Sequence, residues 1–185
     1  MQTKKKKVRS CKKIFTNKIK RKYNFTNKDY NSNDGMMTSI WGPSTWHLLH
    51  SISFNYPISP TNQDKKYYKN FILSLRNILP CGKCRLNLVK NFEKLPLHNY
   101  HMESRDTFSK YIFHLHEIVN TMLDKKSGLT YQKVKDSYEQ FRARCIKKSD
   151  EVIMNEKGCI IPYYGVKNKC VLQIVPVNKQ CKTFI

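Results

Sequence analysis

Apolar residues recur at helical spacing in five successive segments between residues 40 and 145, and prolines or glycines separate most of these segments. The connections between them are short, which is typical of helices that pack as antiparallel neighbours. We therefore expect an all-α fold: a four-helix bundle with a short fifth helix. The expected helices run from about Ile40 to Tyr56, Thr61 to Leu79, Cys81 to about Phe92, Arg105 to Lys125, and Thr130 to Cys145.

Local signals support these helix ends and indicate which faces turn inward. Pro43 suits the first turn of the first helix, and Thr61 with Asp64 has capping-box spacing at the start of the second. Ser127-Gly128 is expected to stop the fourth helix. The stripes expected to face the core include Trp41, Thr45, Leu48, Leu49, Ile52 and Tyr56 on the first helix, and Tyr68, Phe71, Ile72, Leu75, Ile78 and Leu79 on the second.

The segments on either side of the bundle differ in composition. Residues 1–39 are rich in Lys and Asn and are expected to form a disordered basic tail. After Lys147, two short β-prone segments, residues 159–165 and 170–176, predict a small hairpin. The expected organisation is therefore a tail (1–39), a helical domain (40–146) and a cysteine-containing extension (147–185).

The net charge of +22 is unevenly spread, because residues 1–28 hold twelve of the 35 Lys and Arg and no acidic residue. A nucleic-acid contact, a nuclear address, an organellar presequence and a merely solvated tail are all compatible with that composition. No apolar run approaches the ~18 residues that a membrane-spanning helix needs. We therefore expect no membrane span.

Cys81 and Cys84 are separated by two residues and directly follow Pro80, between two helical segments. At the start of a helix, thiolates face the partial positive charge of the N-terminus, which lowers the thiol pKa and favours redox chemistry. The same spacing is also half of a structural zinc site. The pair alone leaves both alternatives open, although seven cysteines in one chain favour a thiol-handling protein.

Two other helices carry polar side chains beside aromatic ones. Trp46 and His50, and likewise His116 and Asn120, stand at i and i+4 and project side by side. Each pair alone is compatible with core packing or an inter-helix hydrogen bond. Together with a dithiol they provide the aromatic surface, imidazoles and amide that suit a flat cofactor with polar edges.

These motifs carry a family resemblance over about residues 40–145. Trp41-Gly42-Pro43-Ser44-Thr45-Trp46-His47-Leu48-Leu49-His50 is similar to the Gly-x-x-Ser/Thr-Trp-x-x-x-His helix of the Erv/ALR family of FAD-linked sulfhydryl oxidases. Tyr56-Pro57 resembles the Tyr-Pro that closes that helix, and Pro80-Cys81-Gly82-Lys83-Cys84 resembles the family's redox centre. The segment from His114 to Asn120 is similar to its flavin-binding helix, Lys125 to its following basic position, and Lys133-Val134 with Tyr138 to its last helix.

The resemblance implies a bundle that binds FAD and forms a homodimer. Cys81 and Cys84 would be the catalytic disulfide, with Cys81 receiving the substrate thiol and Cys84 facing the flavin. The positions that match the family's cofactor-binding segments are Gly42, Thr45, Trp46, His50, Tyr56, His116, Glu117, Asn120, Leu123, Lys125 and Tyr138. No metal ligand is implied.

The chain also departs from the family pattern. Glu117 stands where the family has Asn, and Tyr138 stands where it has Trp. Phe113, and Thr130 or Tyr131, occupy the places of a second disulfide that many cellular members have. Together with the extension that holds Cys159 and Cys170, these differences resemble the branch encoded by large DNA viruses.

The implied function is the formation of disulfide bonds in protein thiols, with electrons passing through the Cys81–Cys84 disulfide and FAD to O2, which gives H2O2. The implied partners are protein dithiols or a thioredoxin-like relay protein. The implied location is the virion or host cytoplasm, or, for a cellular member, the mitochondrial intermembrane space. The sequence does not decide which further cysteines form a shuttle or a structural disulfide; the candidates are Cys11, Cys145, Cys159, Cys170 and Cys181.

Two other interpretations stay open at this point. The first is a zinc-stabilised basic nucleic-acid-binding protein that uses Cys81 and Cys84 with two later cysteines and the Lys-rich tail. Against it, the chain has no second Cys-x-x-Cys pair. The second is an inactive bundle that keeps only the fold and the capacity to dimerise.

Overall fold

The structure, a computed structural model, describes residues 25–144 and 161–163. The chain divides into two units, residues 1–32 and residues 33–185. The described part of the first unit holds the short helix α1 (Asn27–Tyr30), in which Thr26 and Asp29 form a reciprocal capping box. Among the described residues, no helix is both long enough and apolar enough to cross a membrane.

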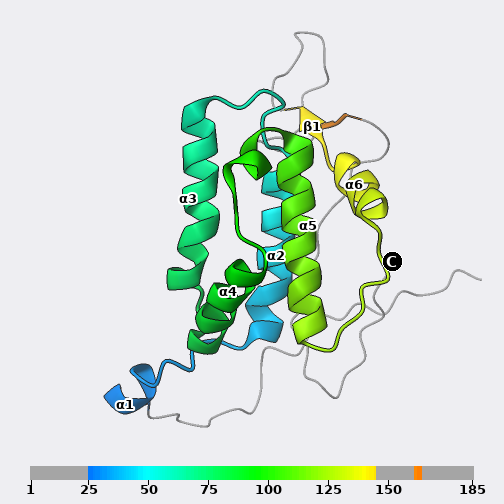
Figure 1. Cartoon of the computed structure of the whole chain (residues 1–185). Coiled ribbons are helices and arrows are strands. Elements are labelled where there is room, and N and C mark those ends of the chain that lie inside the picture. The colour runs from blue at the N-terminus through cyan, green and yellow to red at the C-terminus, as the bar shows by residue number, and fades with distance from the viewer. Residues whose placement is uncertain (1–24, 145–160, 164–185) are drawn as a thin grey trace, which may run out of the picture. The chain divides into compact units, whose positions relative to one another are not determined.

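The second unit contains the predicted bundle, so the all-α prediction is confirmed (Figure 1). Its four long helices are α2 (Thr38–Phe54), α3 (Asn62–Ile78), α4 (Gly82–Lys94) and α5 (Arg105–Met122). The 3-10 helix η1 (Asn99–Met102) connects α4 to α5, and the short fifth helix of the bundle is α6 (Tyr131–Glu139). In Figure 1, α2 lies behind α5, with α3 and α4 on one side of this pair and α6 on the other.

The end of the bundle domain differs from the prediction. The fifth helix, expected to reach Cys145, ends at Glu139, and the chain becomes extended at β1 (Ala143–Arg144). This strand pairs antiparallel with β2 (Ile161–Pro162). Residues 161–162 therefore form a strand as expected, but their described partner is β1. The predicted second hairpin strand, residues 170–176, lies outside the described residues.

Several helix ends follow the predicted chemistry, and two do not. Thr61 and Asp64 form the expected capping box, and Thr130 caps α6 by accepting from the Lys133 N–H. Helix α2 begins two residues earlier than expected, which places Pro43 inside it. Helix α5 stops at Met122 instead of Lys125, because the chain turns at Asp124, which adopts a positive φ of 53°.

The core fills the space between α2, α3, α4 and α5. Tyr56 lies at its centre with 0% exposure, its ring against Tyr68 and Phe108, and its hydroxyl donates to Met102 O at 2.8 Å. Burial raises the pKa of Tyr56 to about 12. The buried cluster consists of Leu49, Tyr56, Ile72, Leu75, Leu88, Phe92, Leu97, Met102, Phe108, Tyr111, Ile112 and Leu115.

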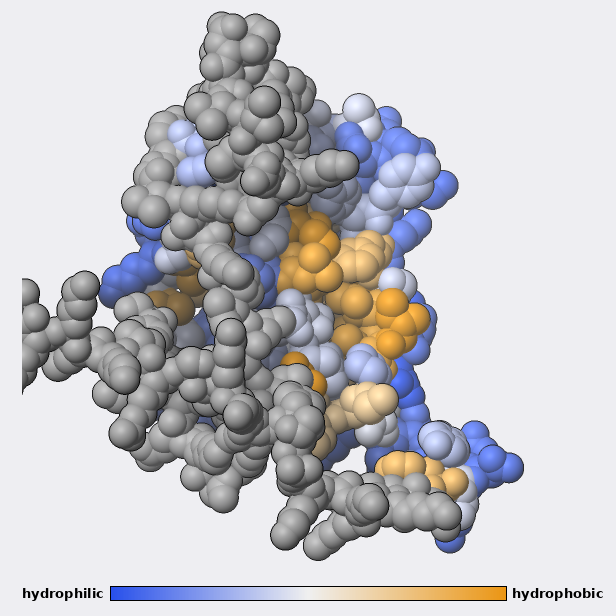
Figure 2. All heavy atoms as spheres, turned by 180° about the vertical axis from the view of Figure 1, so that it is seen from behind, coloured by the Kyte–Doolittle hydropathy of each residue, from blue (hydrophilic) through white to orange (hydrophobic). Residues whose placement is uncertain are grey.

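Three side chains that were expected in the core are exposed instead: Leu48 on α2, and Phe71 and Ile78 on α3. Their exposed fractions are 52%, 36% and 63%, so these two helices carry apolar residues on their outer faces as well as their inner ones. Figure 2 shows hydrophobic side chains gathered on the reverse side of the bundle, where α2 comes to the front. An outward apolar face of this kind is typical of an interaction surface.

The expected disordered tail also ends earlier than residue 39. Asn33 and Met36 form backbone hydrogen bonds with the loop that precedes α4, through the Gly82 N–H and Pro80 O. Composition alone predicted disorder here because Asn, Ser, Asp and Gly dominate residues 31–35. The contacts of Gly35 with Pro80 and Cys81, and of Asn33 with Gly82, outweigh that composition.

Candidate active site

Cys81 and Cys84 form a disulfide at the start of α4, with their Cα atoms 5.2 Å apart. Cys81 is the N-cap residue of the helix, and its Sγ accepts a hydrogen bond from the Cys84 N–H at 3.2 Å. The arrangement follows from the sequence: Pro80 ends the preceding segment, and Cys81 then caps α4. The predicted redox pair is therefore placed at a helix N-terminus, where a thiolate is stabilised.

The same geometry bears on the zinc alternative. Both sulfurs are bonded to each other, and a disulfide offers no thiolate to a zinc ion. Within the described residues, no group of three or more His, Cys, Asp or Glu side chains is arranged to hold a metal ion. The other five cysteines lie outside the described residues.

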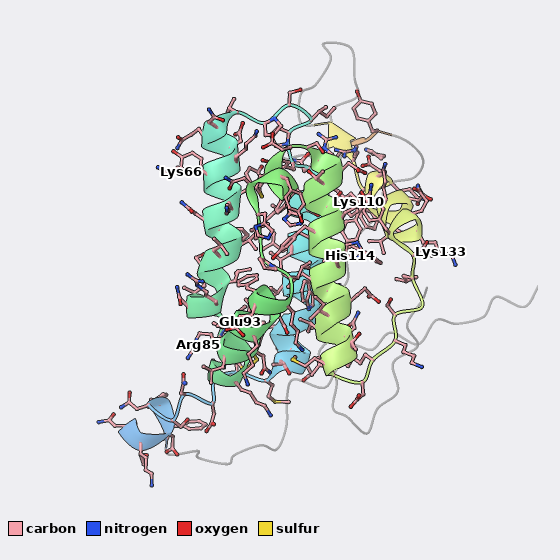
Figure 3. The ribbon with its side chains drawn as sticks, viewed as in Figure 1. Lys66, Arg85, Glu93, Lys110, His114 and Lys133 are labelled. Atoms are coloured by element: carbon pink, nitrogen blue, oxygen red, sulfur yellow. A yellow bond between two sulfur atoms is a disulfide. The ribbon has the colours of Figure 1, made fainter. Side chains whose placement is uncertain are left out.

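Positive charge surrounds the disulfide. Lys83 stands between the two cysteines and is exposed, and Arg85 follows Cys84. Figure 3 shows Arg85 near the N-terminal end of α4. Cationic side chains and the helix N-terminus both favour the thiolates that form when this disulfide is reduced.

A continuous stack of rings joins α2 to α5. Trp46 lies parallel to His116, with ring centroids 4.0 Å apart and an interplanar angle of 9°. His50 Nε2 lies 3.0 Å from His116 Nδ1, within hydrogen-bonding distance. The structure therefore brings together three residues that the sequence placed on two separate helices.

The stack continues through residues at the end of α2 and on α6. Phe54 is 4% exposed and stacks on Tyr138, with ring centroids 5.3 Å apart. Tyr138 also packs against His50, and its hydroxyl lies 3.0 Å from His47 Nδ1. Burial raises the pKa of Tyr138 to about 12, so this hydroxyl stays protonated at neutral pH.

Phe54 and His47 were not predicted as site residues. Phe54 follows His50 by four positions, as His50 follows Trp46, so the helical spacing could have identified it. His47 lies within the α2 motif but was not among the predicted site residues. Its contact with Tyr138 joins positions 91 residues apart, and nothing in the sequence indicates it.

Both histidines of the stack have lowered pKa values. Burial, followed by the nearby His116 and His47, lowers the pKa of His50 to about 4. Burial also lowers the pKa of His116, with an opposing contribution from Glu117. His50 Nδ1 is buried and has no hydrogen-bond partner within the described part of the chain. A buried polar nitrogen without a partner is costly, and a bound ligand atom would satisfy it.

The C-terminal part of α5 presents the polar residues of the candidate site. Asn120 Nδ2 donates to Glu117 Oε1 at 2.9 Å, and the Lys125 N–H donates to Asn120 O at 2.9 Å. Leu123 and the Lys125 side chain are exposed beside them. This places the predicted residues Glu117, Asn120, Leu123 and Lys125 together at one end of α5.

The two small residues of the α2 motif differ in their surroundings. Among the described residues, a Cβ added to Gly42 would meet no atom within 4 Å, so this part of α2 leaves room beside its backbone. The Thr45 hydroxyl donates to Trp41 O at 2.9 Å within the same helix, and the side chain is half-buried. Gly42 therefore fits the predicted close approach of a ligand, whereas the Thr45 hydroxyl already has a partner.

Tyr56 does not fit its predicted place among the cofactor-binding residues. It is completely buried in the core, and its hydroxyl is bonded to Met102 O. The Tyr-Pro pair closes the helix, as expected, but its ring packs against Tyr68 and Phe108. We therefore assign Tyr56 to the core and leave it out of the site proposed below.

A helical bundle with an aromatic and imidazole stack, and a disulfide at the start of one helix, defines a class of thiol-handling redox domains. The Erv1 / Alr family pattern matches residues 43–139 of the chain. The chain belongs to the Erv1 / Alr family. The family resemblance seen in the sequence is thus confirmed.

Curated relatives include viral and cellular proteins. A probable FAD-linked sulfhydryl oxidase of Acanthamoeba polyphaga mimivirus is 38% identical over 105 residues, which are 57% of this chain and 73% of that relative. An FAD-linked sulfhydryl oxidase of African swine fever virus is 30% identical over 100 residues, which are 54% of this chain and 81% of that relative. The mitochondrial FAD-linked sulfhydryl oxidase ERV1 of Saccharomyces cerevisiae is 38% identical over 85 residues. That match spans 45% of this chain and less than half of the yeast protein, 43%.

Solved structures show the same fold. The FAD binding domain of Erv1 from Saccharomyces cerevisiae aligns with a TM-score of 0.51 and 28% identity, covering 56% of this chain and 94% of that domain. The yeast Erv1 core aligns with a TM-score of 0.51 and 24% identity, covering 65% of this chain and 94% of that chain, which supports the fold alone.

Proposed function

We propose that this chain is an FAD-linked sulfhydryl oxidase that forms disulfide bonds in protein thiols and passes the electrons to O2, which gives H2O2. The observation that carries this proposal is the Cys81–Cys84 disulfide at the N-terminus of α4. Family membership supports it, as do the FAD-linked sulfhydryl oxidases among the viral and yeast relatives.

The residues that would hold FAD are those of the ring stack and the polar end of α5. Trp46, His50, His116 and Tyr138 offer flat aromatic surfaces, and His50 Nδ1 is the buried nitrogen that lacks a partner. Gly42 leaves room beside α2 for a ligand. Asn120 and Lys125 offer an amide and a cation that suit the polar edge and the diphosphate of FAD. Bound FAD supplies a carrier for two electrons between thiols and O2.

The thiol chemistry belongs to the protein's own two sulfurs. A substrate thiolate attacks Cys81 Sγ, which forms a mixed disulfide and releases the Cys84 thiolate. A second substrate thiolate then attacks the mixed disulfide, so that the substrate leaves oxidised and Cys81 is released as a thiolate. The Cys84 N–H that donates to Cys81 Sγ, and the N-terminus of α4, stabilise the negative charge on this thiolate.

We also propose that the chain is a homodimer whose interface includes the outward apolar face of α2 and α3. The exposed Leu48, Phe71 and Ile78 support this proposal. Exposed apolar side chains on these helices can be buried against the same side chains of a second copy, in the isologous way that two-fold dimers use.

The two viral relatives favour a viral setting, with the virion or host cytoplasm as the place of action, and the yeast relative is the basis for a mitochondrial alternative. The expected partners are protein dithiols or a thioredoxin-like relay protein. The basic segment of residues 1–28 suits contact with nucleic acid, but the proposed oxidase chemistry does not need it.

Oxygen consumption tests the proposed activity. The purified chain should consume one O2 and form one H2O2 for each dithiothreitol molecule oxidised, because each step carries two electrons. Cys84→Ser should abolish this turnover while FAD stays bound, and Cys11→Ser serves as the matched control that keeps it. If the wild-type chain with bound FAD consumes no O2 in the presence of dithiols, the proposed function is wrong.

A further inference from the structure

Residues 33–36, which we call the strap, lie along the loop that carries the redox disulfide. The Met36 N–H donates to Pro80 O at 2.7 Å, and the Gly82 N–H donates to Asn33 O at 2.9 Å. The strap thus donates one backbone hydrogen bond to the residue before Cys81 and accepts one from the residue after it. This placement ties the segment before α2 to the backbone of the first cysteine.

Two glycines allow this close approach. A Cβ on Gly35 would lie 2.2 Å from Pro80 O and 2.8 Å from Cys81 Cα, and Gly35 has a φ of +78° that favours glycine. A Cβ on Gly82 would lie 2.3 Å from Asn33 Nδ2. Any larger residue at either position would force the strap and the loop apart.

Side chains from α4 and α2 anchor the two ends of the strap. The Arg85 guanidinium donates to Leu79 O at 2.5 Å and to Asn33 Oδ1, which joins the strap to the redox loop. Trp41 Nε1 donates to Met36 O at 3.0 Å. The Arg85 hydrogen bond at Asn33 is charge-assisted, and the Trp41 hydrogen bond at Met36 has ordinary geometry. Together they hold the strap in one position.

The strap bears on thiol exchange because Cys81 is only 8% exposed. An incoming thiolate has to reach a sulfur before exchange occurs, and access is one of the terms that set the exchange rate. The sulfur proposed to receive the substrate therefore lies in a residue that is almost covered, with Gly35 against its Cα.

We propose that the strap determines which thiols reach Cys81: small dithiols and cysteines on flexible, extended segments react faster than thiols on the surface of compact folded proteins. Of the two partners named above, the strap thus favours flexible protein dithiols over a folded thioredoxin-like relay protein. Asn33, Gly35 and Arg85 are thus specificity-determining residues that act by position and do not react. This inference rests on the proposed function, because it assigns a substrate class to the same disulfide.

The test compares a small and a bulky reductant on the same disulfide. Anaerobic rapid mixing gives the second-order rate constants for reduction of the oxidised chain by dithiothreitol and by a reduced, folded thioredoxin. In Gly35→Ala the added Cβ displaces the strap, so the ratio of the thioredoxin constant to the dithiothreitol constant should rise at least about fivefold. A ratio that stays at the wild-type value or falls would overturn the proposal.

Three further measurements keep this test decisive. Gly128→Ala is the matched control, because Gly128 also has a positive φ (+65°) but an added Cβ there meets no atom of the described part of the chain within 4 Å. Its ratio should equal that of wild type. Asn33→Gly keeps the left-handed backbone that Asn33 adopts (φ 66°), removes the partner of Arg85, and should raise the ratio even if Gly35→Ala does not fold. The rate of reoxidation by O2 should stay unchanged in both strap variants, which separates access from general loosening.

The readout also distinguishes the two proposals. If the chain binds no flavin, the proposed function fails, but maleimide labelling of Cys81 and Cys84 followed by peptide mass spectrometry still gives both reduction rates. If flavin is bound and O2 is consumed while the ratio does not change, only the strap proposal fails.

Discussion

His50 Nε2 lies 3.0 Å from His116 Nδ1, and this contact joins α2 to α5 inside the ring stack. One imidazole has to donate and the other accept, so both rings cannot be protonated while the bond persists. His116 also stacks on Trp46, and His50 Nδ1 is buried without a hydrogen-bond partner among the residues that the structure describes. The contact between the two imidazoles thus limits their protonation, and His50 Nδ1 is the atom to which a ligand would bind.

Stability should fall as the pH drops below the range of ordinary histidines. His50 has a pKa of about 4 in the folded chain, against 6.5 for an unperturbed histidine, mainly through burial. Between these values the unfolded chain binds a proton that the folded chain does not, so the contribution is complete above pH 6.5 and is lost toward pH 4. The change is on the order of 3 kcal/mol for the full shift. Urea unfolding at pH 7, 5.5 and 4.5 measures how the free energy of unfolding depends on pH. In His50→Gln this dependence should be weaker, and an equal dependence in the variant would contradict this account.

Gly42→Ala should stabilise the fold but weaken FAD binding. Because the added Cβ meets no described residue within 4 Å and alanine favours a helix interior, the free energy of unfolding without FAD should rise by about 0.5–1 kcal/mol. If FAD approaches the backbone here, its dissociation constant should increase by about tenfold or more, since a methyl group would occupy its place. Chemical unfolding and flavin fluorescence titration check the two effects. An unchanged FAD affinity would remove Gly42 from the site.

Glu117→Gln should tighten FAD binding. The glutamine keeps an oxygen that accepts from Asn120 Nδ2 but removes a negative charge at the proposed site of an anionic cofactor. FAD affinity should rise by a few fold at low ionic strength, and the gain should shrink at high salt because screening weakens the repulsion. Titrations at about 0.02 and 0.5 M salt test this. An affinity gain that is the same at both salt concentrations would argue against a charge effect.

Leu48→Glu should convert the proposed dimer to monomers. Leu48 is 52% exposed on α2, and a carboxylate there would be buried without a partner at the interface. Sedimentation equilibrium should show the dimer dissociation constant rising by at least about tenfold. The matched control is Leu129→Glu, at a residue that is 51% exposed outside this face and should leave the assembly unchanged. A wild-type chain that sediments as a monomer at micromolar concentration would exclude the dimer.

Local chemistry explains which parts of the fold were predictable. The Thr61–Asp64 capping box, the start of the fifth helix at about Thr130 and the position of the cysteine pair after Pro80 depend on neighbouring residues, and each is confirmed. The same holds for the i, i+4 row on α2, which correctly places Trp46 and His50 side by side. These features need no knowledge of the rest of the chain.

Long-range contacts explain what the sequence could not predict. The apolar stripe of α3 gave no sign that Phe71 and Ile78 face outward, because periodicity cannot tell a core face from an interface. The strap was interpreted as tail because its composition is that of a turn, and only its contacts with Pro80 and Gly82 order it. The position of Tyr56 in the core likewise involves a long-range contact, because its hydroxyl donates to Met102 O, 46 residues away.

The visible absorption spectrum of the purified, oxidised chain tests the central claim most directly. We predict a yellow protein with the flavin absorption bands, about one FAD released per chain on denaturation, and loss of the visible colour under anaerobic dithiothreitol through Cys81 and Cys84. His50→Phe, which removes the unpartnered Nδ1 and the bond to His116, should bind less FAD. A folded chain that is colourless as purified, and that takes up no FAD when the cofactor is added, would contradict the account.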